Sequence, residues 1–260
     1  MTIASEEAPF GRLLKEWRSQ RRMSQLDLGL AADVSTRHIS FLETGRSKPS
    51  RTMVMHLSET LSIPRTERNS LLSAAGFSAG YVERDLEGED MEAVRSAIDW
   101  MLERHDPYPA MALDRHWTVV EANDTGRLFL GVSNIGIGDC LLEPMSDVEV
   151  LKQMFANWEE VGRYFLARLR TEATHLGGDW KLEVAAKRLQ ETLPVAFEVE
   201  QRPLPAVIPA RYRFGDKVLS FFSTISHFGT VEDIILADMK LEFMFAADEE
   251  TKTFFADRQN

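Results

Sequence analysis

The sequence predicts two domains: an all-α domain of five short helices, then an α+β domain with an antiparallel sheet and helices over it. Three observations support this. Apolar residues recur at helical spacing in five segments before residue 77. A very acidic stretch, residues 83–92, then interrupts the chain. Beyond it, one helix, two strands, several helices and three strands are expected, which is not the alternation of a βαβ sheet.

Composition fits a protein with a full core and no membrane segment. The chain has 260 residues, 44% hydrophobic and 27% charged, enough for two ordinary domains. Cys140 is the only cysteine, which excludes an internal disulfide and a cysteine zinc site. No apolar run approaches the roughly 20 residues that span a bilayer. The first residues, MTIASEEAPF, do not resemble a signal peptide. We therefore expect a cytoplasmic protein that does not bind membranes.

Charge is distributed unevenly along the chain. The net charge is −11, yet residues 1–80 hold 11 Lys and Arg against 8 Asp and Glu. Residues 81–260 hold 19 against 33. A basic part joined to an acidic part is expected when only the first touches phosphate. The charge pattern thus permits nucleic-acid binding by the first domain alone.

Residues 24–46 form the centre of the first domain and are expected to fold as two short helices with a turn at Asp33. Ser24 and Ser35 are good N-caps for them, and Gly45 can end the second. Three further helices are expected over residues 10–22, 50–61 and 64–76. The stripes expected to face the core are Leu26, Leu30 and Ala31 in the first short helix, and Ile39 and Leu42 in the second.

Five short motifs in this region follow one order: Ser24-Gln25, Leu30-Ala31, Val34-Ser35, Ile39-Ser40 and Glu43-x-Gly45. They resemble the helix-turn-helix of the XRE, or lambda-repressor-like, family, and the resemblance covers residues 9–77. Asp33 stands where the family usually has glycine, but Asp tolerates the left-handed region better than most residues. The resemblance implies a helix that lies in the major groove of a double-stranded DNA operator, which a homodimer would bind.

The outward face of the second short helix carries the candidate base contacts. Arg37 can reach guanine O6 and N7 with two hydrogen bonds. Thr36 and Ser40 match other base-facing positions, and Phe41 can contact a thymine methyl group. Each of these side chains can instead touch only phosphate. The flanking residues are expected to position the DNA backbone; they are Gln25, Ser35, Arg46 and Lys48.

An acidic linker, residues 78–90, is expected to separate the first domain from the second, residues 91–258. A run this charged cannot bury itself. The elements expected after it are a helix over 91–105, a hairpin over 110–122, a short helix from Asn123, a long helical region over 147–175, a helix over 179–193, strands over 207–214, 218–227 and 239–246, and a helix over 247–258.

The hairpin motif Asp114-x-x-Trp117-x-Val119-x-x-Ala122-Asn123-x-x-Gly126-x-x-Phe129 is similar to the start of a PAS domain. Further runs are YPAMALDRHWTVVEAN, NWEEVGRYFLARLRTEA, PARYRFGD, LSFFSTISHFGT and LEFMFAADEET. Together they resemble the ligand-binding domain of MmyB-like transcription regulators over most of residues 91–250. The resemblance implies a PAS-like sensor whose suggested ligands are fatty-acid-like.

We expect a chain-like apolar ligand between a sheet face with Phe221, Ser223 and Phe243 and a helix with Trp158 and Phe165. The same residues can equally form a filled core, because the sequence pattern of an apolar lining is the same for an open pocket and for a filled core. A cation near the aromatic stripes can meet a ligand carboxylate. The candidate pocket residues are Trp117, Phe155, Trp158, Phe165, Arg168, Tyr212, Phe221, Ser223, His227 and Phe243.

Enzyme motifs are missing from the sequence. It has no GxSxG elbow, P-loop or HExxH, and its six histidines show no metal spacing. We expect no catalytic residue, metal or cofactor beyond a fatty-acid-like ligand. The predicted function is sequence-specific transcription regulation in response to a small apolar effector. In the alternative, the PAS-like domain serves only dimerisation or partner binding.

Overall fold

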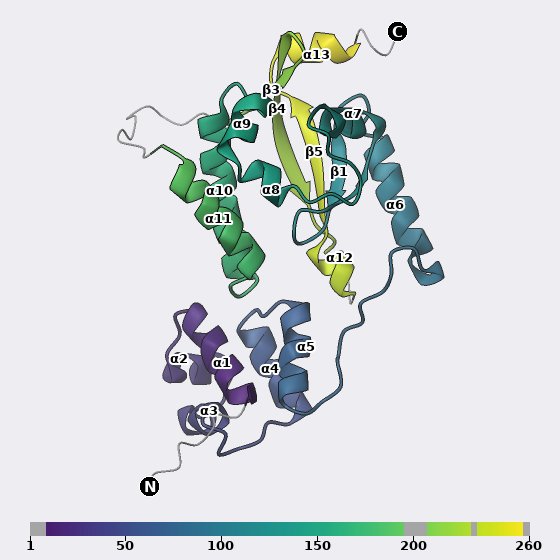
Figure 1. Cartoon of the computed structure of the whole chain (residues 1–260). Coiled ribbons are helices and arrows are strands. Elements are labelled where there is room, and N and C mark those ends of the chain that lie inside the picture. Colours follow the sequence, from purple (N-terminus) through teal and green to yellow (C-terminus); the bar gives the residue numbers. More distant parts are fainter. Residues whose placement is uncertain (1–8, 195–206, 230–232, 257–260) are drawn as a thin grey trace. The chain divides into compact units, whose positions relative to one another are not determined.

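The computed structural model describes residues 9–194, 207–229 and 233–256. It divides into two compact units, the first formed mainly by the chain up to Glu83 and the second by most of the remainder. Figure 1 shows the helical unit in purple and blue, and the unit with the sheet in teal to yellow. The two-domain fold class predicted from the sequence is confirmed.

The first unit consists of five α-helices. Ser24, Ser35 and Ser50 are the N-caps of α2, α3 and α4, and each hydroxyl accepts a hydrogen bond from the backbone N–H three residues later. Local sequence therefore determines where these helices begin. The helices are α1 (Pro9–Gln20), α2 (Gln25–Ala31), α3 (Thr36–Glu43), α4 (Arg51–Thr60) and α5 (Arg65–Ala74).

The α3 helix is fixed against α1 by close backbone packing. A Cβ atom at Gly11 would lie 2.3 Å from the carbonyl oxygen of Glu43, so only glycine permits this approach. Ile39 and Leu42, predicted to face inward, are buried in a core that all five helices share. Its members include Phe10, Leu14, Trp17, Leu28, Ile39, Leu42, Val54, Leu57, Leu71 and Leu72.

The stripe predicted for α2 is wrong. Leu26 and Leu30 are 56% and 74% exposed, whereas Leu28 and Ala32 are buried. Both sets are apolar and both have helical spacing. Packing of α2 against the turn that leads to α3 favours the second set, because Gly29, next to Leu28, is buried and a Cβ atom added to it would lie 2.6 Å from the Val34 carbonyl oxygen.

The second unit is an antiparallel sheet with the strand order β2-β1-β5-β4-β3. Helices pack on several of its strands: α6 on β1, α7 on β1 and β2, and α9 on β3 (Figure 1). The elements are α6 (Glu92–Glu103), β1 (Ala110–Leu113), β2 (Val119–Ala122), α7 (Asp124–Val132), α8 (Leu142–Met145), α9 (Val148–Met154), α10 (Trp158–His175), α11 (Trp180–Thr192), β3 (Ala210–Phe214), β4 (Lys217–Ser226), α12 (Ile234–Asp238), β5 (Lys240–Ala246) and α13 (Glu249–Ala256), with a 3-10 turn at Glu89–Met91.

Sheet register separates two apolar faces. Ser223 pairs with Met244, while the next residue of β4, Thr224, pairs with Phe243. Phe243 belongs to the cluster that contains Ile98 of α6 and residues of α12. Ser223 and Phe221 point to the other face, where Phe221 meets Phe129 of α7 at a ring-centroid distance of 5.4 Å.

The predicted long helix over 147–175 is instead two helices, α9 and α10, separated at residues 155–157. These residues pair with the free edge of β3. The Arg211 carbonyl oxygen accepts from the backbone N–H of Ala156, and the Asn157 side-chain oxygen accepts from the backbone N–H of Arg211. Phe155 is accordingly extended, with φ −122° and ψ 135°. The last predicted helix is observed to Ala256; residues 257 and 258 lie outside the described part.

Candidate DNA-binding surface and ligand cavity

The α3 helix presents the predicted polar face outward. Arg37 is exposed, and Thr36, Ser40 and Phe41 are partly exposed. The opposite face of the helix holds the buried Ile39 and Leu42. An eight-residue helix that is anchored on one side and open on the other has the form needed to enter a major groove.

Two predicted DNA contacts lie against Phe41. The Arg37 Cζ atom is 5.1 Å from the centroid of the Phe41 ring, and the Arg46 Cζ atom is 5.9 Å from it. The structure thus brings together a residue of α3 and a residue of the following loop. Lys48 is exposed in the same loop.

A buried ion pair holds the start of α2 and the end of α3. Glu43 is 3% exposed and accepts from Arg18, with Nε–Oε1 2.6 Å and Nη2–Oε2 3.0 Å. The Gln25 amide also donates to Glu43 Oε2, at 2.7 Å. Glu43 thus pairs with an arginine of α1. Gln25, predicted to contact phosphate, is oriented by this carboxylate, while Ser35 caps α3.

Arg37→Ala is expected to reduce sequence preference more than general affinity for DNA. The side chain lies on the exposed face of α3, and a bidentate guanine contact gives about 1–3 kcal/mol of discrimination. Binding to a selected duplex and to random duplexes should be compared by fluorescence anisotropy. Equal losses of affinity for the selected and the random duplexes would show that Arg37 contacts phosphate and not a base.

The second unit has a cavity of about 200 Å³ between the sheet and α10. It opens where β3, β4 and β5 approach the helix. Apolar and aromatic side chains dominate its wall, with Arg168, Glu242 and Ser223 among the polar exceptions. The full lining is Trp117, Met145, Phe155, Val161, Tyr164, Phe165, Arg168, Ile208, Pro209, Ala210, Tyr212, Ser223 and Glu242.

Six of the ten predicted pocket residues line this cavity: Trp117, Phe155, Phe165, Arg168, Tyr212 and Ser223. The other four do not. Phe243 points to the opposite sheet face, so placing it beside Ser223 was wrong. Phe221 is buried among aromatic rings beside the cavity. Trp158 lies under the ammonium group of Lys152, and His227 follows β4, its Nδ1 3.2 Å from the Met239 carbonyl oxygen.

Sequence reasoning missed Glu242, although strand alternation carried the signal. Because side chains alternate along a strand, Glu242 lies on the face of β5 opposite Leu241 and Phe243. Ile208 and Pro209 were also missed, since nothing in the sequence shows that residues before β3 meet α10, and so was Tyr164 of α10.

Arg168 brings a positive charge to one wall of the cavity, where its Cζ atom lies 4.2 Å from the centroid of the Trp117 ring. The ammonium group of Lys240, which is not part of the cavity lining, lies 4.4 Å from the same ring. Glu242 brings one negative charge to the same cavity. Burial, and then the Glu242 carboxylate, raise the pKa of the Tyr212 phenol, which is a neutral hydroxyl at physiological pH. The wall can therefore hold an anionic or polar head group beside an apolar chain.

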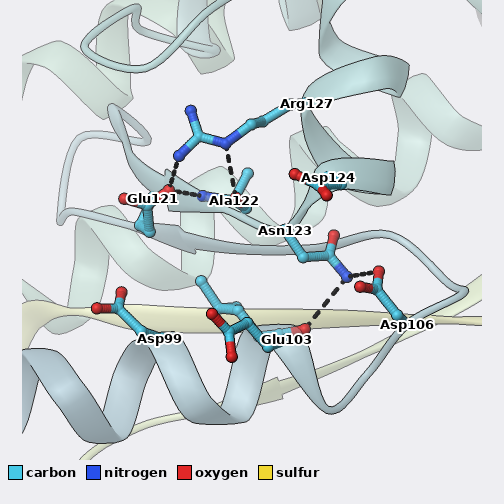
Figure 2. Close-up of a pocket in the computed structure, with 9 residues that line it drawn as sticks. Asp99, Glu103, Asp106, Glu121, Ala122, Asn123, Asp124 and Arg127 are labelled. Atoms are coloured by element: carbon cyan, nitrogen blue, oxygen red, sulfur yellow. Dashed lines mark hydrogen bonds and ion pairs between the residues drawn. The ribbon is translucent and has the colours of Figure 1, made fainter.

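A second cleft, of about 290 Å³, lies between α6, β2 and α7 (Figure 2). Burial, followed by the nearby Asp124, raises the pKa of Asp106. Arg127 pairs with Glu121. Among the described residues no group of three or more His, Cys, Asp or Glu is arranged to hold a metal ion. The acidic side chains of the cleft are Asp99, Glu103, Asp106, Glu121 and Asp124.

Two family models match the chain. Residues 94–256 match the MmyB-like transcription regulator ligand binding domain, and residues 9–71 match a helix-turn-helix domain. A search of curated proteins gave no match. In the described part of the chain, no helix is long and apolar enough to cross a membrane. The larger match alone covers more than half of the 260 residues.

Proposed function

The chain belongs to the MmyB-like transcription regulators, and we propose that it reads a specific DNA sequence through α3 and responds to a small amphipathic ligand. DNA binding and transcription regulation follow from the two domains. The proposal adds the residues that read DNA, the ligand class and the homodimer. The observation that carries it is a cavity with an apolar wall and a cationic edge in the domain matched to ligand binding.

For DNA, the proposal assigns base contacts to Arg37, Thr36 and Ser40, and backbone contacts to Arg46 and Lys48. The exposed face of α3 and the adjoining basic loop support this. One recognition helix gives limited specificity, so we propose a homodimer on a two-fold operator. This proposal is tested by selecting, with the full-length chain, the duplexes that it binds from a random library. A selected sequence with two inverted half-sites is expected.

For the ligand, the cavity supports a molecule with a short apolar chain and a polar or anionic head. Its volume, about 200 Å³, lies below the roughly 300–1,000 Å³ typical of sites for drug-sized molecules. A short acyl chain therefore fits better than a long one. The expected pose puts the head group near Arg168 and the chain against Phe155 and Phe165. Mass spectrometry of small molecules that co-purify with the native chain tests this class.

Ser223→Phe is expected to block ligand without unfolding the domain. The new ring would occupy the cavity, whereas overpacking a filled core costs about 1–3 kcal/mol. Thr224→Phe is the matched control, since Thr224 is the next residue of β4 and faces the other way. Melting temperature and co-purified ligand should be measured for both. A large drop in melting temperature for Ser223→Phe alone, with no ligand in wild type, would favour a role in assembly.

The assembly role has one observation in its favour. The sheet face opposite the cavity carries stacked Phe222 and Phe245 rings, 5.4 Å apart, next to the exposed Thr224 and Val218. Apolar groups on an exposed strand face suit a contact with another chain. If Thr224→Phe or Thr224→Lys changes the oligomeric state while ligand is never found, the second candidate function is the better one.

A further inference from the structure

We propose that Phe41 positions two arginines at once, and so couples base reading by Arg37 to backbone binding by Arg46. The inference rests on the proposed role of α3 in reading DNA. It assigns Phe41 a task different from the thymine contact expected from its sequence position. Phe41 would act through its neighbours, as a positioning residue for DNA recognition.

The ring lies within cation–π range of both guanidinium groups. Arg37 Cζ is 5.1 Å and Arg46 Cζ 5.9 Å from the ring centroid, and such contacts extend to about 6 Å. Arg37 and Phe41 are four residues apart in α3, so they share one face of the helix. Arg46 belongs to the loop, so its position over the ring depends on where the loop turns.

The backbone brings the loop back over α3. Gly45 has φ 71°, a left-handed conformation that glycine adopts without strain, and the chain reverses there. The Ser47 backbone N–H then donates to the Phe41 carbonyl oxygen at 3.1 Å. The Thr44 hydroxyl donates to the Ser40 carbonyl oxygen at 2.7 Å. None of these bonds uses the Phe41 ring, so the loop should keep its path when the ring is replaced.

The Phe41 ring also lies outside the apolar core. The core cluster of the first unit, with the partly buried residues packed against it, does not include Phe41 within the described chain. Replacing the ring should therefore leave the fold intact. The ring reduces the entropy cost of DNA binding. Arginine side chains lose rotamer freedom when they bind, and a guanidinium that is already stacked on the ring has lost part of that freedom before binding. Each stack at an exposed site should be worth about two- to fivefold in affinity.

Leucine and tyrosine separate the two roles of Phe41. Leucine is apolar and can still touch a thymine methyl group, but it offers no π face. Tyrosine keeps the π face. If Phe41 only contacts thymine, Phe41→Leu should change preference at one A·T pair. If Phe41 positions both arginines, Phe41→Leu should weaken preference at the guanine that Arg37 reads and reduce the salt dependence that Arg46 contributes.

The experiment measures dissociation constants of full-length wild type, Phe41→Leu and Phe41→Tyr. The probes are duplexes selected by the wild type and their single-base variants, at several salt concentrations. We expect Phe41→Leu to bind the selected duplex roughly four- to twentyfold more weakly. Its salt slope should fall by up to about one. Phe41→Tyr should stay close to wild type. If Phe41 positions Arg37, the two side chains act as one unit in the wild type. Arg37→Ala should then cost less base discrimination in the Phe41→Leu background than in the wild type, because Phe41→Leu has already removed part of the effect.

Several results would overturn the inference. These are equal affinity of Phe41→Leu and wild type, a loss confined to one A·T pair, or a failure of tyrosine to restore binding. Circular dichroism should show the same melting for all variants; if Phe41→Leu melts early, Phe41→Met replaces it in the same tests. A wild-type chain that selects no sequence would instead overturn the proposed DNA reading itself, and the inference with it.

Discussion

Replacing Glu43 with alanine is expected to destabilise the helix-turn-helix domain by roughly 3–5 kcal/mol, because it leaves the Arg18 guanidinium without its carboxylate in a buried site. Arg18 makes two hydrogen bonds to Glu43, at 2.6 and 3.0 Å, and Gln25 makes a third. The pair joins α1 to the end of α3. Urea unfolding of the full-length chain, followed by circular dichroism, should show an earlier first transition, and DNA affinity should fall with it.

The chain offers a matched control for this prediction. Arg12 and Glu16 form an ion pair at 2.9 Å, with both side chains about half exposed. Glu16→Ala should cost only about 0–0.5 kcal/mol, since solvent screens the pair. The double variant Arg18→Met/Glu43→Leu should regain much of the lost stability, because it removes both buried charges. The explanation fails if Glu43→Ala is as harmless as Glu16→Ala.

The residues around Glu43 show how far the sequence could predict this domain. Caps and stops act locally, so Ser24, Ser35 and Gly45 could be assigned from the chain alone. The inward face of α2 could not. Leu26 with Leu30, and Leu28 with Ala32, have the same helical spacing. The choice depends on where α1 and α3 lie, which the sequence of α2 does not encode.

The second domain shows the same limit at the level of the sheet. Alternation correctly divides the side chains of β4 and of β5 into two faces each. It does not say which face of β4 lies on the same side of the sheet as which face of β5. Pairing of Thr224 with Phe243 decides that, and it depends on register. In the same way, apolar spacing continues across residues 155–157, where pairing with β3 breaks the helix. Long-range contacts thus determine the parts of the cavity wall that the sequence misplaced.

Two of the six cavity residues that the sequence predicted share one property. Phe165 lies on α10 and Ser223 on β4, and the periodicity of each element shows which of its faces points inward. Glu242 is a charged residue on a largely apolar wall, and its carboxylate adds to the rise in the pKa of the Tyr212 phenol. A single charged residue at an inward strand position is the sequence signal that identifies it.

Asn123→Ala is expected to destabilise the second domain by roughly 2–4 kcal/mol. Asn123 is 5% exposed, and its Oδ1 accepts from the backbone N–H groups of Ala110 and Gly126, both at 2.9 Å. Its Nδ2 donates to Asp106 Oδ1 at 2.9 Å (Figure 2). The carbonyl oxygens of Leu102 and Tyr108 also accept from it. Alanine would remove the α7 cap, which costs about 1 kcal/mol, and leave a buried donor unpaired, which costs about 1–3 kcal/mol more.

Asp147→Ala is the control for Asn123→Ala. Asp147 caps α9 from a partly exposed position and also pairs with Arg188 at 2.9 Å, so its loss should cost only about 1–1.5 kcal/mol. Differential scanning calorimetry of the full-length chain measures both variants. If the two variants lower the unfolding temperature of the second domain equally, Asn123 acts as an ordinary cap and does not join α6, β1 and α7.

Asn123→Asp adds a pH test to the same prediction. A carboxylate at this position can still accept from Ala110 and Gly126, but it cannot donate to Asp106 while ionised. Asp106 already has a raised pKa, from burial and from Asp124, and a second carboxylate beside it would raise the pKa of the pair further. A raised folded-state pKa gives stability that is present at low pH and is lost as the pH rises through it. The variant should therefore approach wild-type stability below about pH 4 and fall away from it toward pH 7. A stability difference that stays constant over this range would show that the lost hydrogen-bond donors, and not charge repulsion in the acidic cleft, account for the effect.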